Sequence, residues 1–423
     1  MDYLPRVIDS ELTSLVADVP AVLVVGPKAV GKTESARRLA RSVIDLADVD
    51  QRTVVQAARR DALDRATKPV LIDEWQFDPD TWEAMRRAVD DDPAPGRFLL
   101  TGSANPRNVR VHSGAGRVVR VRMRPMSLAE RGSTNPTVSL AALWRQKATQ
   151  VGGTTTMTVA DYAHEIVDSG FPGIRLAPQR ARARMVTSYV SSVLDHDVKE
   201  LGFVPRRADS LLHWLRAYAA ASSTTTTYEA IARAIPDDQP PTRATISAYR
   251  DVLSQLWLLD PVPAFSLSRN RLNELGRMPK HQLADPALVT ALLRITPESL
   301  LDASAGREFA TLRDGPLLGT LFESLATLCV RVYAQALDLE ISHLRTARGE
   351  REVDMLVHSP DGRTLAFEVK LTATPSDTDV RHLNWLANRL GDDLIDRVVL
   401  TTGRQAYRRP DGVAVVPLAL LGP

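Results

Sequence analysis

The stretch Gly26-Pro27-Lys28-Ala29-Val30-Gly31-Lys32-Thr33 decides the fold of the first part of the chain. It matches the pattern G-x-x-x-x-G-K-[ST], and it stands between an apolar run at 21–25 and a helical pattern that begins at Glu34. A buried strand, a glycine loop and a helix in this order bind phosphates through backbone N–H groups. Lys32 would reach the β and γ phosphates, and the Thr33 hydroxyl would bind Mg²⁺. We therefore expect residues 26–34 to bind ATP or another nucleoside triphosphate.

Two further apolar runs predict the strands that complete this site. The run 69–72 ends in Asp73 and Glu74. An acid at the end of such a strand holds Mg²⁺ in P-loop enzymes, which predicts this role for Asp73, and Glu74 is placed to polarise the attacking water. The run 97–101 leads into polar residues that could sense the γ-phosphate, namely Thr101, Ser103 and Asn105, with Ser103 favoured. Strands alternating with helices predict an α/β fold with a parallel sheet and a site at the strand carboxyl ends.

A basic segment follows the third strand. Residues 93–129 hold seven arginines and no acidic residue. The alternation in 119–124 would place Arg120, Arg122 and Arg124 on one strand face. Three interpretations stay open: a solvated outer face, an arginine finger that reaches the nucleotide of a neighbouring subunit, or contacts to a nucleic-acid backbone. Arg117 is the first choice for the finger, which would require a homo-oligomer.

Length and composition limit the remaining possibilities. A chain of 423 residues predicts two or three domains, and a net charge of +2 means that DNA binding would need a local basic patch. The single cysteine, Cys329, lies in an apolar helical run and predicts core packing. The N-terminus lacks a signal pattern, and no uncharged apolar run approaches the ~18 residues that span a bilayer. These features predict a soluble, cytoplasmic protein.

We expect three parts: a P-loop core at 1–135, a helical connector at 136–300, and a third domain at 301–423. Within the connector, 209–265 reads as a winged helix-turn-helix, with the capping pattern 226–229 before its second helix and Thr242 before its third. The exposed face of that third helix would offer Arg243, Thr245, Arg250 and Gln255. Such modules contact either DNA or proteins, so both partners stay open.

The third domain carries a short pattern of acids and a lysine. Asp354 and Glu368 fall on two strands that the turn signal 361–362 joins, and Lys370 shares a face with Glu368. Asp followed by Glu-x-Lys is the arrangement of restriction-endonuclease-like nucleases. There the two carboxylates bind Mg²⁺ and the lysine stabilises charge on the phosphate. Glu323 would add a carboxylate from a preceding helix. A working nuclease and a relic that serves as a DNA-binding or scaffolding shell both fit this pattern.

Taken together, these motifs resemble the bacterial and archaeal AAA-type ATPases that carry the domain of unknown function 4143 at the C-terminus. The resemblance rests on the stretches 26–33, 71–74, 100–103, 116–117, 124–130, 170–172, 189–197, 279–280 with Asp285, 322–323, 352–354 and 367–370. It implies an ATPase core, a winged-helix connector and a nuclease-like C-terminus, and it leaves the biological role open. The segment 284–286 departs from the family pattern.

The main hypothesis is a Mg²⁺-dependent ATPase whose hydrolysis drives rearrangement of a DNA-associated C-terminal domain. One alternative is an ATP-dependent DNA nuclease, which would cleave through Asp354, Glu368 and Lys370. Another is a protein-binding scaffold that is switched by nucleotide and does not cleave.

Overall fold

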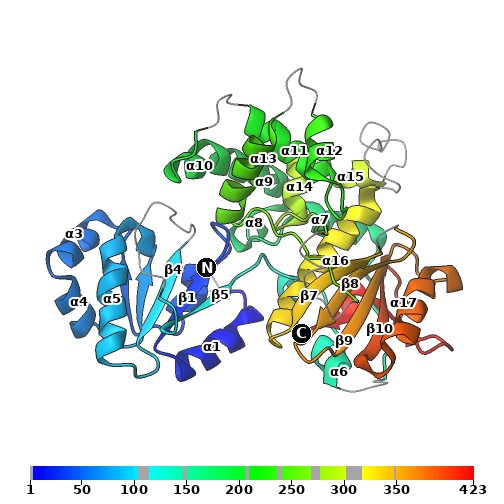
Figure 1. Ribbon diagram of the computed structural model, residues 1–423, viewed down its shortest axis with the longest axis horizontal. Helices are drawn as coiled ribbons and strands as arrows, with labels where there is room; N and C mark the ends of the chain where they lie inside the picture. Colours follow the sequence, from blue (N-terminus) through cyan, green and yellow to red (C-terminus); the bar gives the residue numbers. More distant parts are fainter. Residues whose placement is uncertain are drawn as a thin grey trace.

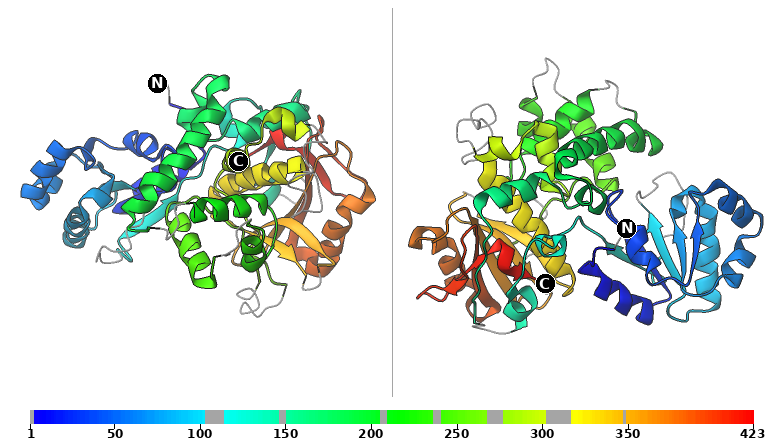
Figure 2. Two further views of the ribbon diagram at one scale, coloured as in Figure 1. Left: turned by 90° about the horizontal axis from the view of Figure 1, so that it is seen from above. Right: turned by 180° about the vertical axis from the view of Figure 1, so that it is seen from behind.

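The computed structural model describes residues 3–102, 114–145, 150–204, 209–235, 241–267, 277–301, 317–346 and 349–423. Figure 1 shows an N-terminal α/β unit in blue, a second sheet in orange and red, and a group of mainly green helices above and between them. The views in Figure 2 keep the two sheets on opposite sides of the molecule. The middle of the chain contacts both sheets, since Asp260 lies 2.8 Å from Arg122 of the first sheet and Ala264 forms a bridge to His343 of the second.

The first sheet is parallel throughout and has the order β2-β3-β4-β1-β5. Its strands are β1 (Ala21–Val25), β2 (Ser42–Asp45), β3 (Val70–Asp73), β4 (Phe98–Gly102) and β5 (Val118–Arg122). The expected parallel α/β fold is confirmed. Because β4 lies between β1 and β3, the end of β4 separates the loop after β1 from the acids after β3.

Helices cover both faces of this sheet. Because alternate residues of a strand point to opposite faces, each strand contributes side chains to both cores. On one face α3 (Val49–Ala57), α4 (Arg59–Arg65) and α5 (Pro79–Asp91) pack on Leu23 and Ile72. The other face packs on α1 (Ile8–Asp18) and α2 (Lys32–Arg37), and its core continues into the helical segment. A sheet buried on both faces explains why its strands read as unbroken apolar runs.

The middle of the chain is helical. Its helices are α7 (Val159–Val167), α8 (Pro172–Arg175), α9 (Gln179–Ser192), the π-helix η3 (Val193–Asp197), α10 (Val198–Glu200), α11 (Ser210–Ala220), α12 (Tyr228–Arg233), α13 (Arg243–Gln255), α14 (Pro286–Leu293) and α15 (Pro297–Leu301). Thr242 caps α13 as expected, whereas α12 is capped by Thr227 and not by Thr226. After α13, isolated antiparallel bridges join Leu259 to Leu283 and Val262 to Lys280. The winged-helix assignment stays a prediction.

The C-terminal sheet is mixed, with the order β11-β12-β10-β9-β8-β7. Its elements are α16 (Leu317–Gln335), β7 (Glu340–Arg345), β8 (Glu352–His358), β9 (Thr364–Lys370), α17 (Asp377–Leu390), β10 (Leu394–Thr401), β11 (Tyr407–Arg408) and β12 (Ala414–Pro417). Helix α16 packs on one face of the sheet and α17 on the other. Among the described helices, α16 alone is long and apolar enough to cross a membrane, but 72% of its most apolar window is buried inside the protein. It is therefore a core helix of this fold.

A segment between the N-terminal unit and the helices pairs with the C-terminal end of the chain in a separate two-stranded sheet. Strand β6 (Val138–Ser139) pairs in parallel with β13 (Leu421–Gly422) near the C-terminus. Helix α6 (Leu140–Arg145) follows it and lies below the second sheet in Figure 1. The chain thus passes along the C-terminal unit before it enters the helical segment.

Candidate functional site

The P-loop geometry depends on glycine at two positions. Gly26 has φ 150°, and a Cβ there would lie 2.3 Å from the carbonyl oxygen of Met123, the residue directly after β5. Gly31 has φ 106° and directly precedes α2. Both conformations are ones that residues with a side chain rarely adopt. The loop is therefore fixed against β1 and β5, with its curvature set by the two glycines.

Lys32 is buried at the start of α2 and points back into the loop. Its ammonium donates to the carbonyl oxygens of Gly26 at 3.0 Å and Pro27 at 2.9 Å. Burial lowers the pKa of Lys32 to about 8, although the nearby carboxylates of Glu74 and Asp73 act in the opposite direction. Among the described residues the ammonium donates to carbonyl groups and to no carboxylate, so a phosphate bound there would supply negative charge.

Thr33, Asp73 and Thr101 meet where β3 and β4 end and α2 begins. The Thr33 hydroxyl donates to Asp73 Oδ1 at 2.9 Å, and the Thr101 hydroxyl donates to the same oxygen from the neighbouring strand. Thr101 is thus the one sensor candidate that the structure describes, because Ser103 and Asn105 lie outside the described residues. Hydroxyl and carboxylate oxygens are the donors that Mg²⁺ prefers, so this set fits the ion. Bound there through Thr33 and Asp73, Mg²⁺ would neutralise charge on the β and γ phosphates.

Glu74 follows Asp73 in a left-handed backbone conformation, with φ 50° and ψ 48°. Such strain in a residue with a side chain concentrates at functional sites, where surrounding contacts maintain it. The Gln76 side-chain amide donates to Glu74 Oε2, a contact that the sequence pattern did not predict. Gly102 lies close by, and a Cβ there would be 2.8 Å from both Gln76 Oε1 and Trp75 Nε1. Glu74 is therefore held by its own turn at the end of β3.

Two contacts around the P-loop come from distant parts of the chain. The Lys28 ammonium lies 3.0 Å from Asp197, the last residue of η3. Arg6 is buried and donates to the Val30 carbonyl oxygen at 3.0 Å and the Arg124 carbonyl oxygen at 2.6 Å. Single π-helical turns occur frequently at functional sites, which draws attention to Asp197. Neither Arg6 nor Asp197 belongs to a local motif that assigns it to the nucleotide loop.

The basic segment divides among different roles. Arg120 is exposed, as the interpretation of a solvated face expects, and Arg117 pairs with Asp90 of the same chain. The interpretation of a solvated face does not hold for Arg122 and Arg124, because both guanidinium groups bind the buried Asp260 of the middle segment at 2.8 Å. The buried acid attracts them, and this contact could not be read from the strand alone. The finger role of Arg117 stays a prediction.

Helix α13, the third helix of the predicted winged helix-turn-helix, exposes less of its expected contact face than predicted. Arg243 is exposed, but the Arg250 guanidinium stacks 3.8 Å from the centroid of the Tyr228 ring. Thr245 shares its hydroxyl with the Thr242 cap, and Gln255 donates to a backbone oxygen within the helix. Arg250 therefore packs α13 against α12.

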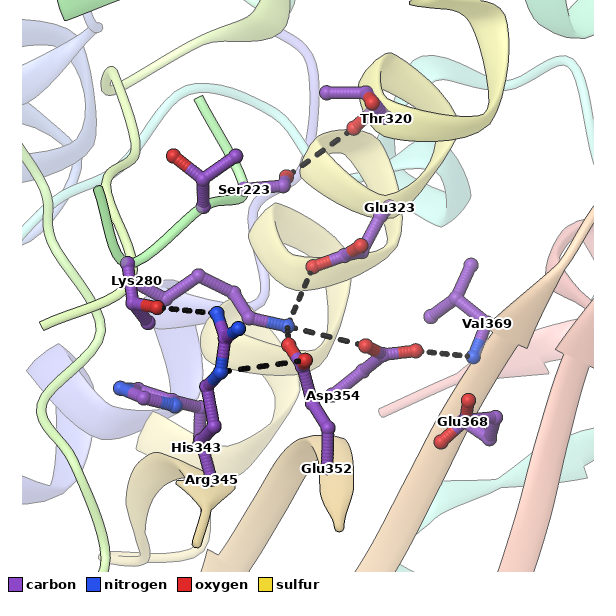
Figure 3. A network of polar contacts seen from close by, with 12 residues as sticks. Ser223, Lys280, Thr320, Glu323, His343, Arg345, Glu352, Asp354, Glu368 and Val369 are labelled. Atoms are coloured by element: carbon purple, nitrogen blue, oxygen red, sulfur yellow. Dashed lines mark hydrogen bonds and ion pairs between the residues drawn. The ribbon is translucent and has the colours of Figure 1, made fainter. Parts of the chain in front are cut away.

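In the C-terminal unit, the structure brings the predicted residues together on β8 and β9. The Lys370 ammonium lies 2.8 Å from Glu368 Oε1, and Asp354 Oδ2 accepts the Val369 N–H at 2.9 Å. Glu323 of α16 faces the same place (Figure 3). Burial, followed by the neighbouring Asp354 charge, raises the pKa of Glu368 to about 8. Glu368 Oε2 is buried without a hydrogen-bond partner among the described residues.

Comparison with known families covers most of the chain. Residues 18–131 match the family model of an AAA domain, and residues 318–421 match that of the domain of unknown function 4143. This protein joins an AAA domain to a domain of unknown function 4143. Residues 159–299 match another domain of unknown function, numbered 8612. The AAA domain thus contains the whole P-loop site, and the 4143 domain contains Asp354, Glu368 and Lys370.

Individual relatives add no described activity. Two proteins described as uncharacterized, from Mycobacterium bovis and Mycobacterium tuberculosis, are each 26% identical over 368 residues, or 84% of this chain and 71% of theirs. Among solved structures, a Walker-type ATPase of Pyrococcus abyssi aligns with a TM-score of 0.41 and 14% identity. That alignment covers 69% of this chain and 96% of that one.

The acids of the 4143 domain surround a lysine that the sequence analysis did not assign to the site. The Lys280 ammonium lies 2.9 Å from Glu323 Oε1, 3.1 Å from Asp354 Oδ1 and 3.4 Å from Glu352 Oε1 (Figure 3). Burial disfavours its charge, but these three carboxylates outweigh it and raise the pKa of Lys280 well above its usual value. The only earlier signal was the Pro279-Lys280 pair in the family resemblance.

This arrangement does not fit a Mg²⁺ ion at Asp354 and Glu368. An ion about 2.1 Å from Asp354 Oδ1 would lie within about 5 Å of the ammonium, which is itself 3.1 Å from that oxygen, and the two cations would repel. Mg²⁺ is usually held by one or two carboxylates together with several waters, and here both oxygens of Asp354 already have partners. Among the described residues, no group of three or more His, Cys, Asp or Glu side chains is arranged to hold a metal ion. The nuclease hypothesis therefore gains no support from these contacts.

Proposed function

We propose that the protein is a Mg²⁺-dependent ATPase whose nucleotide state acts on the 4143 domain. The observation that carries this proposal is the 2.9 Å contact between the Thr33 hydroxyl and Asp73. It joins the P-loop to the acid of β3 at the edge where parallel strands bind ligands. The AAA family match supports nucleotide binding and hydrolysis by this domain.

Each residue near this contact has a role that its position supports. Gly26 and Gly31 keep the loop open for phosphate, and Lys32 neutralises the β and γ oxygens. Thr33 and Asp73 would hold Mg²⁺, while Glu74 would orient the water and accept its proton. Thr101 of β4 donates to Asp73 and would sense the γ-phosphate. The finer assignments of Ser103 as sensor and Arg117 as finger remain predictions.

The proposed link to the 4143 domain runs through β5 and its arginines. The Met123 N–H donates to the Val25 carbonyl oxygen at 2.7 Å, directly before the P-loop. The neighbouring Arg122 binds Asp260, which also lies 2.8 Å from Arg331 of α16. A displacement of the P-loop would therefore move a strand that is bonded to the middle segment and, through it, to the core helix of the C-terminal unit.

A phosphate-release assay with the full-length protein, ATP and Mg²⁺ tests this function. We expect turnover by the wild type and a loss of at least about 100-fold in Glu74→Gln, because a general base contributes that much or more. Lys32→Ala should lose both turnover and ATP affinity. Glu340→Gln, which removes an exposed carboxylate on β7, is the matched control and should keep wild-type turnover. Absence of hydrolysis by the wild type, with and without DNA, would refute the enzymatic proposal.

A nucleotide-switched scaffold is the second candidate, and Lys280 favours it over a nuclease. A C-terminal site neutralised by a buried lysine is better suited to binding than to metal-dependent cleavage. Tight ATP binding with slow turnover that DNA does not change would favour the scaffold. Single- and double-stranded DNA are therefore separate arms of the ATPase assay, and stimulation by either would support the proposed DNA partner. Sedimentation with and without ATP would test the proposed homo-oligomer.

A further inference from the structure

Lys280 is fixed in place by its backbone before its side chain makes any contact. Its N–H and carbonyl groups both pair with Val262 at 2.9 Å, and the adjacent His281 N–H donates to the Thr224 carbonyl oxygen at 2.8 Å. The side chain is only 1% exposed. The Lys280 side chain therefore extends from a paired backbone in the middle segment into the 4143 domain. It would leave this position only if these backbone hydrogen bonds opened.

The number of N–H donors on the Lys280 ammonium equals the number of carboxylates that face it. An ammonium group has three N–H donors and accepts no hydrogen bond. Three carboxylates face it: Glu323 of α16, and Glu352 and Asp354 of β8. Both Asp354 oxygens are occupied, since Oδ1 faces the ammonium and Oδ2 accepts the Val369 N–H. Figure 3 shows the ammonium between the helix and the strand, where a bound cation would touch both.

We propose that the Lys280 ammonium is a built-in cation that takes the place of a divalent metal in this nuclease-like site. It neutralises the carboxylates that would otherwise bind the metal, and it joins the middle segment to the 4143 domain. This inference goes beyond the proposed ATPase function and does not depend on it.

Glu368 is consistent with the same assignment. It lies next to the lysine-filled cluster but pairs with Lys370, and its second oxygen, Oε2, has no hydrogen-bond partner among the described residues. One open carboxylate oxygen supplies a single ligand of the six that Mg²⁺ requires. Removal of Lys280 would take the ammonium away from one oxygen each of Glu323, Glu352 and Asp354. Asp354 Oδ2 would keep the Val369 N–H, and Glu352 Oε2 would keep Arg345 at 3.9 Å, so a metal ion would have to be held by the three released oxygens.

Metal binding to the full chain tests this proposal without any activity assay. Mn²⁺ binding is measured by calorimetry and by electron paramagnetic resonance, without nucleotide, at up to about 1 mM free ion, the range of weak protein sites. The proteins are the wild type, Asp354→Asn, Lys280→Ala and the double variant of these positions. Lys199→Ala, which removes an exposed lysine of α10, is the matched control. All proteins are first compared by circular dichroism.

We expect Lys280→Ala to gain one Mn²⁺ per chain that the double variant loses, whereas wild type, Asp354→Asn and Lys199→Ala bind equally. Mn²⁺ should also raise the melting temperature of Lys280→Ala and leave that of the wild type unchanged. A folded Lys280→Ala protein that gains no Mn²⁺ would overturn the proposal. If Lys280→Ala does not fold, the wild type and Asp354→Asn are compared instead. A Mn²⁺ ion bound by the wild type but not by Asp354→Asn would overturn the proposal, and equal binding by the two proteins would support it.

Discussion

Asp260→Asn should destabilise the contact between the AAA domain and the rest of the chain more than the other substitutions of charged residues proposed below. Asp260 is 3% exposed, and its carboxylate lies 2.8 Å from guanidinium nitrogens of Arg122, Arg124 and Arg331. Burial alone would raise the pKa of Asp260, but the three arginines outweigh it and hold the pKa far below its usual range. The group is therefore charged at every working pH, and asparagine removes that charge at nearly constant size.

The magnitude follows from the number and burial of the partners. One pair of unit charges 4 Å apart contributes about 4 kcal/mol at an effective dielectric constant of about 20. Three such attractions are reduced by repulsion among the arginines and by desolvation. Measured losses for breaking a buried pair are about 3–5 kcal/mol. We expect Asp260→Asn to fall in this range, because it leaves buried guanidinium groups without a counter-charge.

The assay is thermal and urea unfolding, with probes for each unit, since a chain of several domains need not unfold in one step. Asp396→Asn is the matched control: among the described residues, the side chain of this buried aspartate pairs with one arginine, Arg408, and not with three, so a smaller loss is expected. The double variant Asp260→Asn/Arg331→Met should recover part of the stability, because one unpaired cation is removed. The reasoning fails if Asp260→Asn is no more destabilising than the control, or if the second substitution makes the loss larger.

Two further predictions concern the nucleotide loop. Burial lowers the pKa of Lys32 to about 8, and bound phosphate would raise it again, so ATP binding should take up a proton. The affinity for ATP should therefore fall as the pH rises above that value. Calorimetry at about pH 8.5 in buffers of different ionisation enthalpy measures the proton uptake, and equal heats of binding in all buffers would contradict it. Asp197→Asn should release Lys28 and tighten ATP binding severalfold while changing stability by less than about 1 kcal/mol, because Lys28 is 55% exposed. Asp195→Asn, an exposed neighbour on η3, should change neither quantity, and weaker ATP binding in Asp197→Asn would count against the assigned contact.

The P-loop could be predicted because its chemistry is local. Glycines, lysine and threonine stand within eight consecutive residues, and a parallel sheet places the acid of another strand at the same edge. Thr101 was among the predicted candidates, but its contact with Asp73 depends on the strand order, with β4 between β1 and β3. Lys280 and Asp260 could not be assigned from sequence alone. The partners of their side chains lie more than 40 residues away in the sequence. A single lysine or aspartate also has no sequence pattern that predicts its burial.

These two residues belong to one short ladder, and this gives the coupling proposal its physical content. The Asp260 N–H donates to the Gln282 carbonyl oxygen at 2.9 Å, and Val262 pairs with Lys280. The same bridge thus carries an acid bound by arginines of the AAA domain and a lysine bound by acids of the 4143 domain. Both charges are buried and both backbone segments are paired, so the ladder can move as a unit. Separation of either charge from its partners would cost several kcal/mol of stability, because it would leave a buried charge unpaired. A shift of β5 on nucleotide binding would therefore reach Glu323 and Asp354 through Lys280, and a metal ion in its place would break that connection.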